Sequence, residues 1–293
     1  MTKSSLIFFF FHRYINYTGI LVILFTVLTA CSNTKFIYTF AQKFIRDEIS
    51  YFVDLNKEEE VFLNQQVSKM ITWHQKSMLP SYAAYMIDIA DKLELDKYSS
   101  ADIAVMIAYG RSLIEETVIG LTPYASQFLI RHQTVDDIQF IKQRMVKRYQ
   151  KRLEEISKPP EVRYEDRLNR LMSNFERFFG ELSDTQIILL ETYALATLDD
   201  SKVRLYNRKM RQKVFIKFLS TQPTQEELMN YLNKLLLNGH EIINPTYHDF
   251  SEASLKRFQE LLASILLISS EKQQESIIVN LRRYADDFIA VSR

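Results

Sequence analysis

The 293-residue chain contains a single cysteine, Cys31, and its thiol is the most distinctive reactive group in the sequence. One thiol cannot build an intramolecular disulfide framework or a thiolate metal cluster. It can act as a nucleophile or accept a covalent modification. The residues that precede Cys31 decide between these chemistries.

The segment before Cys31 has the organisation of an export signal. Residues 1–19 carry Lys3 and Arg13, residues 20–30 are uncharged and apolar, and polar residues follow at once. A basic region, a short apolar region and small residues before the cut describe a secretory signal peptide. The apolar run of 11 residues is about half of what a membrane-crossing helix needs. We expect residues 1–30 to be cleaved; the alternative is an uncleaved anchor over residues 14–30.

The end of this segment, Leu28-Thr29-Ala30-Cys31, resembles the lipobox of bacterial lipoproteins. The resemblance implies that diacylglycerol is attached to the Cys31 sulfur, that cleavage precedes Cys31, and that the new amine is acylated. Two or three acyl chains anchor a protein stably, whereas one anchors it marginally. Ser32 follows Cys31. By similarity to known lipoproteins, a serine at this position implies that the protein is located at the outer membrane of a Gram-negative cell, with residues 31–293 in the periplasm.

The composition predicts an all-α fold, an irregular bundle of amphipathic helices. Only 5 Gly and 6 Pro occur, and good helix formers abound. Capping pairs mark six helix starts: Asn56 with Glu59, Ser99 with Asp102, Thr134 with Asp137, Ser183 with Gln186, Thr224 with Glu227, and Ser270 with Gln273. We expect helices near 36–53, 57–78, 81–95, 100–119, 123–131, 135–156, 161–180, 184–198, 201–219, 225–238, 251–267 and 271–290. Residues 34–40 could be extended, and a subdomain seam could lie near 157–161.

The stretch around the only tryptophan contains a second motif. It reads Trp73-His74, four residues, Leu79-Pro80, Ser81, Tyr82-Ala83. With the lipobox and a later element over residues 176–186, it resembles an uncharacterised family of proteobacterial lipoproteins, a domain of unknown function. The resemblance implies a helical periplasmic domain on a lipid anchor and carries over no catalytic residue. We interpret Trp73, His74, Pro80 and Tyr82 as structural. A single histidine without nearby cysteine or carboxylate ligands does not make a metal site.

Basic residues are concentrated in the middle of the chain. Residues 31–137 hold 10 basic and 15 acidic residues, whereas residues 138–217 hold 18 and 11. In residues 135–156 the basic side chains flank an apolar stripe: Ile138, Ile141, Met145, Tyr149, Leu153 and Ile156. Residues 202–217 contain no acid between their basic residues: Lys202, Arg204, Arg208, Lys209, Arg211, Lys213 and Lys217. This surface could bind an envelope protein, anionic lipid head groups or peptidoglycan, or it could match the acidic N-terminal third of the same chain.

Several function classes find little support. Without residues 1–30 the chain has 35 basic and 36 acidic residues, which argues against a nucleic-acid binder. Residues 239–244 lack the second histidine of a zinc-protease motif, and no glycine-rich phosphate loop exists. We therefore expect no cofactor and no catalytic residue. The carboxylates at 58–60, 115–116 and 286–287 are better explained as solvated helix faces.

Three functions remain as hypotheses. The first is a non-enzymatic, membrane-anchored envelope lipoprotein that acts as a binding or structural module. The second is a periplasmic chaperone-like protein, which would need an exposed apolar groove. The third, with least support, is an enzyme that acts on cell-wall glycan and needs two carboxyl groups facing one cleft.

Overall fold

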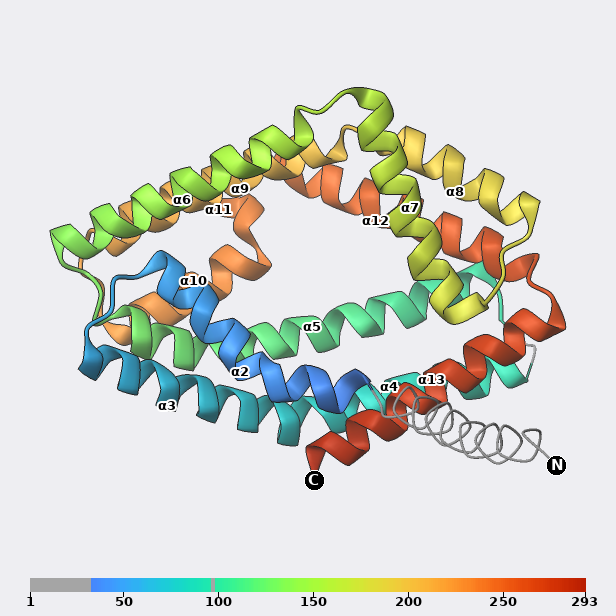
Figure 1. Cartoon of the computed structure of the whole chain (residues 1–293), viewed down its shortest axis with the longest axis horizontal. Coiled ribbons are helices and arrows are strands. Elements are labelled where there is room, and N and C mark those ends of the chain that lie inside the picture. Colours follow the sequence, from blue (N-terminus) through green and yellow to red (C-terminus); the bar gives the residue numbers. More distant parts are fainter. Residues whose placement is uncertain (1–32, 96–97) are drawn as a thin grey trace, which may run out of the picture.

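The computed structural model describes residues 33–95 and 98–293 (Figure 1). All regular secondary structure in these ranges is helical. The elements are α2 (Asn33–Phe52), α3 (Lys57–Trp73), η1 (His74–Met78), α4 (Leu79–Glu94), α5 (Ser100–Leu129), α6 (Val135–Ile156), α7 (Pro160–Phe179), α8 (Asp184–Ala196), α9 (Asp200–Leu219), α10 (Gln225–Leu237), α11 (Gly239–Ile243), α12 (Thr246–Leu267) and α13 (Glu271–Ser292). The predicted all-α multi-helix bundle is confirmed. Cys31 and the predicted signal peptide lie outside the described residues.

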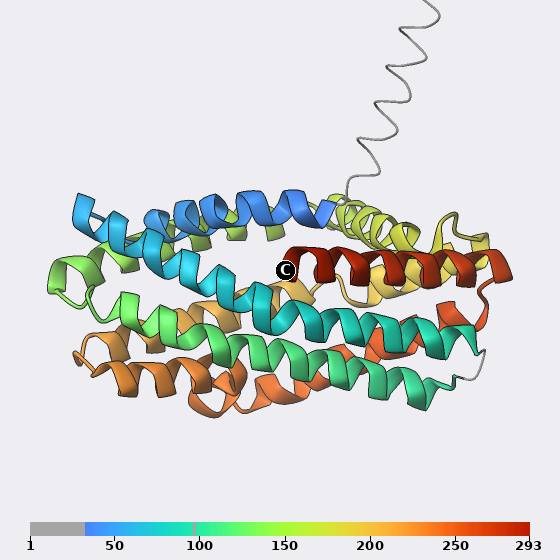
Figure 2. The same cartoon turned by 90° about the horizontal axis from the view of Figure 1, so that it is seen from below.

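The helices are arranged as an elongated frame (Figure 1). α6 and α9 run together along one long side, while α2, α3 and α5 form the opposite side. α13 lies along α4, although the two helices come from distant parts of the chain. In the view turned by 90°, most helices follow the longest axis of the molecule (Figure 2).

Two groups of buried side chains hold the helices of this frame together. One group joins α4, α7, α8, α12 and α13, and the other joins α2, α3, α6, α9 and α10. α5 contributes Ile103 to the first group and Phe128 to the second, so this 30-residue helix spans both. The loop between α6 and α7 connects the two groups, and the subdomain seam near 157–161 stays a prediction.

The helices begin where their capping residues place them. All six predicted capping boxes are present: Asn56 with Glu59, Ser99 with Asp102, Thr134 with Asp137, Ser183 with Gln186, Thr224 with Glu227, and Ser270 with Gln273. Each box satisfies backbone N–H groups that have no partner within the helix. These local bonds explain why the helix starts could be predicted from the sequence.

Pro123 does not end a helix, and the predicted break between 119 and 123 is wrong. A proline lacks the N–H that would donate to the carbonyl of Ile119. The Thr122 hydroxyl donates to that carbonyl instead, at 2.8 Å. The same hydroxyl lies 2.8 Å from Asn233 Oδ1 of α10, so α5 continues through the proline while it packs against α10.

Three further boundaries differ from the prediction. A π-helical turn, η1, joins α3 to α4 before Pro80, with the N–H of Leu79 donating to the carbonyl of His74. Residues 34–40 belong to α2, whose apolar side chains recur every three or four residues and pack against the core: Tyr38, Ala41, Ile45, Ile49 and Phe52. α12 begins at Thr246, five residues before the predicted start, because the Asn244 side chain accepts a hydrogen bond from the Thr246 N–H at 3.2 Å.

Candidate functional site

α9 carries the predicted basic residues of segment 202–217 and divides six of them between two opposite faces. Residues three or four apart share one face of a helix. The lysine face holds Lys209, Lys213 and Lys217, and the arginine face holds Arg204, Arg208 and Arg211. Lys202 lies on the same side of α9 as the lysine face, two turns before Lys209, but it forms an ion pair with Asp199 at 2.8 Å.

The lysine face borders a groove of about 690 Å³ between α6 and α9. Its apolar lining consists of Met145, Val146, Tyr149, Tyr206, Met210 and Ile216. Four lysines also line it: Lys142, Lys209, Lys213 and Lys217. No acidic residue does. Two residues of the predicted apolar stripe of α6, Met145 and Tyr149, line this groove.

The four groove lysines have no acidic partner within the described ranges. The lysines that do form ion pairs there are Lys92, Lys158, Lys202 and Lys234. Lys209 instead places its Nζ 4.8 Å from the ring centroid of Tyr149, a cation–π contact. An apolar groove with unpaired cations at its edges is complementary to an amphipathic anion.

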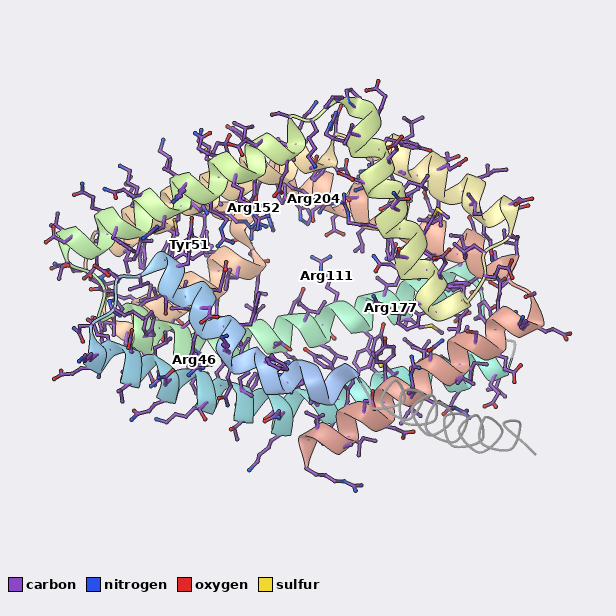
Figure 3. The ribbon with its side chains drawn as sticks, in the orientation of Figure 1. Arg46, Tyr51, Arg111, Arg152, Arg177 and Arg204 are labelled. Atoms are coloured by element: carbon purple, nitrogen blue, oxygen red, sulfur yellow. The ribbon has the colours of Figure 1, made fainter. Side chains whose placement is uncertain are left out.

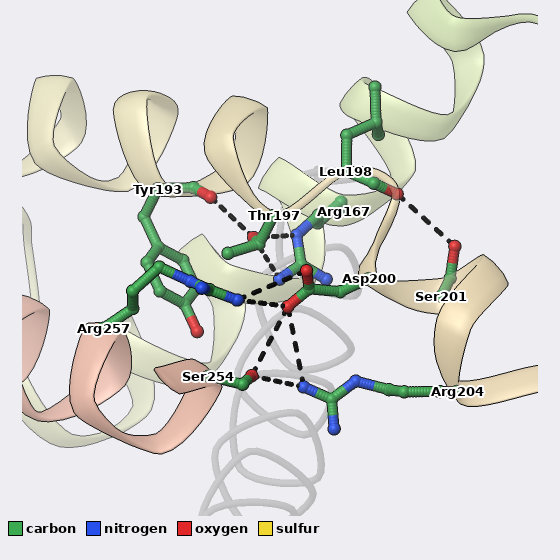
Figure 4. A network of polar contacts seen from close by, with 9 residues as sticks. All are labelled: Arg167, Tyr193, Thr197, Leu198, Asp200, Ser201, Arg204, Ser254 and Arg257. Carbon is green, nitrogen blue, oxygen red and sulfur yellow. Dashed lines mark hydrogen bonds and ion pairs between the residues drawn. The ribbon is translucent and has the colours of Figure 1, made fainter. Parts of the chain in front are cut away.

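Asp200, at the start of α9, supplies negative charge at one end of the arginine face (Figure 4). Its carboxylate accepts hydrogen bonds from Arg257 of α12 at 3.0 and 3.3 Å. It also lies 3.7 Å from Arg204 Nη2, which donates to the Ser254 hydroxyl at 2.6 Å. The Asp200 side chain is only 12% exposed, so water screens these ion pairs less than pairs on the open surface.

The middle of the arginine face has no such partner. In Figure 3, Arg152 of α6 and Arg204 point toward the middle of the frame, and Arg111 of α5 points into it from the other long side. Arg111 is paired with Glu252 at 2.9 Å. Arg208 forms no ion pair within residues 33–95 and 98–293. The arginine face is therefore a second cationic surface, on the side of α9 away from the groove.

The motif residues lie outside the groove and pack where several helices meet. Trp73 packs so closely on Gly120 of α5 that a Cβ at position 120 would lie 1.9 Å from the indole ring. Tyr82 is hydrogen-bonded to Thr117 of the same helix. Pro80 stands in the first turn of α4, where no helical N–H is required. The interpretation of the motif residues as structural stays a prediction.

His74 is held by aromatic neighbours. The Tyr38 hydroxyl and His74 Nδ1 lie 2.6 Å apart, within hydrogen-bond distance, and the Tyr82 ring stands 5.7 Å from the imidazole. Burial lowers the pKa of His74 and raises the pKa of Tyr38 to about 12. His74 thus links α2 to the η1–α4 segment.

His132 is a buried histidine that the sequence analysis missed. Neither ring nitrogen has a hydrogen-bond partner, and the side chain is 1% exposed. Its Nδ1 lies 3.9 Å from carboxylates of both Glu59 and Asp137. Burial nevertheless lowers its pKa, against the pull of these two carboxylates. The sequence identified the two acids as members of capping boxes and Glu59 also as part of an acidic cluster, but no spacing in the sequence relates them to position 132.

Two other kinds of site, a metal centre and a membrane-spanning helix, are absent from the described residues. They contain no group of three or more His, Cys, Asp and Glu placed to hold a metal ion. In the described segments no helix has both the length and the apolarity needed to cross a membrane. Of the carboxylate pair at 115–116, Glu115 accepts from Arg111 at 3.2 Å.

The architecture and the two cationic faces define an all-α protein with candidate binding surfaces. In a comparison with known protein families, residues 51–248 match a family of unknown function, DUF6279. The chain belongs to this family. The comparisons with curated proteins and with solved structures gave no match.

Proposed function

We propose that this protein is a lipid-anchored binding module of the bacterial cell envelope, and that the α6–α9 groove binds an acidic amphipathic helix of a partner protein. The observation that carries the binding proposal is the set of four lysines without acidic partners around an apolar groove. Peptidoglycan is polar and would leave the apolar lining unused. An amphipathic helix fills such a groove with its apolar face and offers carboxylates to the flanking cations.

Two properties of the groove support this partner. Met145 and Met210 contribute flexible, polarisable side chains that adapt to the shape of a bound helix. Lysines on long stems neutralise carboxylates without demanding one geometry, which suits the edge of an interface. Binding of this kind weakens as salt is raised.

The anchor part of the proposal rests on Leu28-Thr29-Ala30-Cys31. Cells grown with labelled palmitate should label the wild-type protein but not Cys31→Ala. Ser32→Ala, which keeps the thiol, serves as the control and should be labelled. Label retained in Cys31→Ala would show that the anchor is not at Cys31.

The groove is tested by site-specific crosslinking in living cells. A photo-reactive residue at Tyr206, which lines the groove and is 58% exposed, should capture a defined partner. The matched control is Val279 of α13, which is 59% exposed and lies elsewhere. Equal capture from both positions, or none from Tyr206, would contradict the proposal.

Charge neutralisation then tests the lysines. Lys209→Gln, Lys213→Gln and Lys217→Gln together should weaken partner binding by roughly threefold to 150-fold, since exposed ion pairs contribute about 0.2–1 kcal/mol each. The control triple, at the equally exposed Lys43, Lys69 and Lys76, removes the same net charge. An equal loss in both triples would mean that net charge, not the groove, controls binding.

The apolar lining also favours a second candidate, a chaperone-like function. A holdase would accept several unrelated unfolded clients through the same groove, and Tyr206→Asp would abolish suppression of their aggregation. Crosslinking of one stoichiometric partner, with no protection of unfolded clients, supports the binding module instead.

A further inference from the structure

Arginines of α6 lie beside the arginine face of α9. α6 packs against α9, and Arg152 of α6 points toward the middle of the frame, as Arg204 of α9 does (Figure 3). Burial and the nearby charges of Arg152, Arg148 and Arg211 lower the pKa of Arg208. Positive charge from both α6 and α9 therefore acts on the Arg208 guanidinium.

Other arginines of this region have acidic partners. Glu48 of α2 accepts from Arg148 through both carboxylate oxygens, at 3.0 and 3.2 Å. Asp200 lies beside Arg204. Three arginines of this region, Arg152, Arg208 and Arg211, form no ion pair within the described segments. The buried Nε of Arg152 has no hydrogen-bond partner either. A buried donor without a partner indicates a place where a ligand can complete the bonding.

Arg211 is held in place by neutral groups only. Its Nε donates to Asn207 Oδ1 at 3.1 Å, and its Nη1 donates to the Leu236 carbonyl at 3.5 Å. The guanidinium packs against Gly239, where a Cβ would lie 3.1 Å from it. These contacts fix the plane of the side chain but leave its charge uncompensated. A preorganised cation loses less freedom when it binds an anion.

We propose that Arg152, Arg208 and Arg211 form a binding site for a phosphoryl group. A guanidinium offers parallel N–H donors that match two oxygens of a phosphate, and phosphate has enough oxygens and charge to engage several guanidiniums at once. A single carboxylate, with two oxygens and one charge, would leave part of the cluster uncompensated. The phosphoryl group can belong to a free phosphate or to a lipid head group. This site is independent of the α6–α9 groove.

Isothermal titration calorimetry of the full chain in maltoside detergent tests this site at constant ionic strength. The probes are inorganic phosphate and short-chain phosphatidic acid. We expect saturable binding that falls at least tenfold in Arg208→Gln and in Arg152→Gln, because each removes charge-assisted hydrogen bonds. Arg208→Lys keeps the charge but loses the paired donors, and should bind with intermediate affinity. Tighter binding of phosphatidic acid than of inorganic phosphate would assign the phosphoryl group to a lipid, and equal binding to a free anion.

Arg111→Gln is the matched control, because Arg111 points into the same space but already pairs with Glu252. It should bind phosphate like the wild type. Circular dichroism spectra would show that each variant is folded. Absence of saturable binding in the wild type, or equal affinity in Arg208→Gln, Arg152→Gln and wild type, would overturn the proposal.

Discussion

Replacing Asp200 by asparagine should destabilise the fold by about 2 kcal/mol. The substitution keeps the shape of the side chain and one acceptor oxygen but removes the charge. In the wild type, Arg257 donates to both carboxylate oxygens at 3.0 and 3.3 Å. A hydrogen bond to a charged group contributes about 1.5–3 kcal/mol, compared with about 0.5–1.5 kcal/mol for a neutral one. Losing about 1 kcal/mol in each of two bonds gives the expected value, and the 36% exposure of Arg257 keeps it from being larger.

Urea unfolding followed by far-ultraviolet circular dichroism would measure this loss. The neighbouring Asp199 is 69% exposed, so Asp199→Asn is a control that should cost less than about 1 kcal/mol. A double-mutant cycle with Arg257→Gln should show a coupling of about 1 kcal/mol between positions 200 and 257. Equal losses in the two asparagine variants, or no coupling, would refute the reasoning.

Three other predictions concern buried groups. Gln273→Ala should lower the free energy of unfolding in urea by about 2–4 kcal/mol, because the Gln273 and Gln186 amides exchange hydrogen bonds of 2.8 and 3.1 Å. Gln186→Ala should cost a similar amount, and the double variant should lose much less than the sum of the two. The free energy of unfolding should fall as the pH drops from about 7 to about 5, by up to about 1.4 kcal/mol per pH unit, because the unfolded state protonates His132 before the folded state does; His132→Gln should flatten this dependence. Gly120→Ala should destabilise by about 1–3 kcal/mol and change the fluorescence of Trp73, whereas unchanged fluorescence would contradict the contact.

Helix starts could be predicted from the sequence because each depends on two residues three positions apart. The Ser183–Gln186 and Ser270–Gln273 boxes illustrate both the success and its limit. Each was predicted separately, yet the two glutamines also bond to each other and join α8 to α13. A pairing 87 residues apart in the chain leaves no local pattern.

Prediction from local sequence patterns was wrong where a side chain supplied a hydrogen bond that the backbone could not make. Pro123 was expected to end a helix, but the Thr122 hydroxyl bonds to the carbonyl that the proline leaves free. The candidate site shows the same limit. The charge run in 202–217 could be found in the sequence, and helical spacing divides it into two faces. Only the packing of α6 against α9 shows that one face borders a groove. On the other face, only the tertiary structure shows that Arg204 has an acidic partner whereas Arg208 and Arg211 form no ion pair within the described residues.

The contact between α13 and α4 has a consequence for the order of folding. Arg282 of α13 bonds to Asp91 and Glu94 of α4, across 191 and 188 residues of chain. During synthesis from the N-terminus, the face of α4 that α13 covers stays uncovered until nearly all of the sequence has been made. Contacts of such sequence separation form late and slow folding, because the intervening chain must first be brought together. Until α13 has formed, this face of α4 stays exposed, and uncovered apolar surface of this kind favours aggregation.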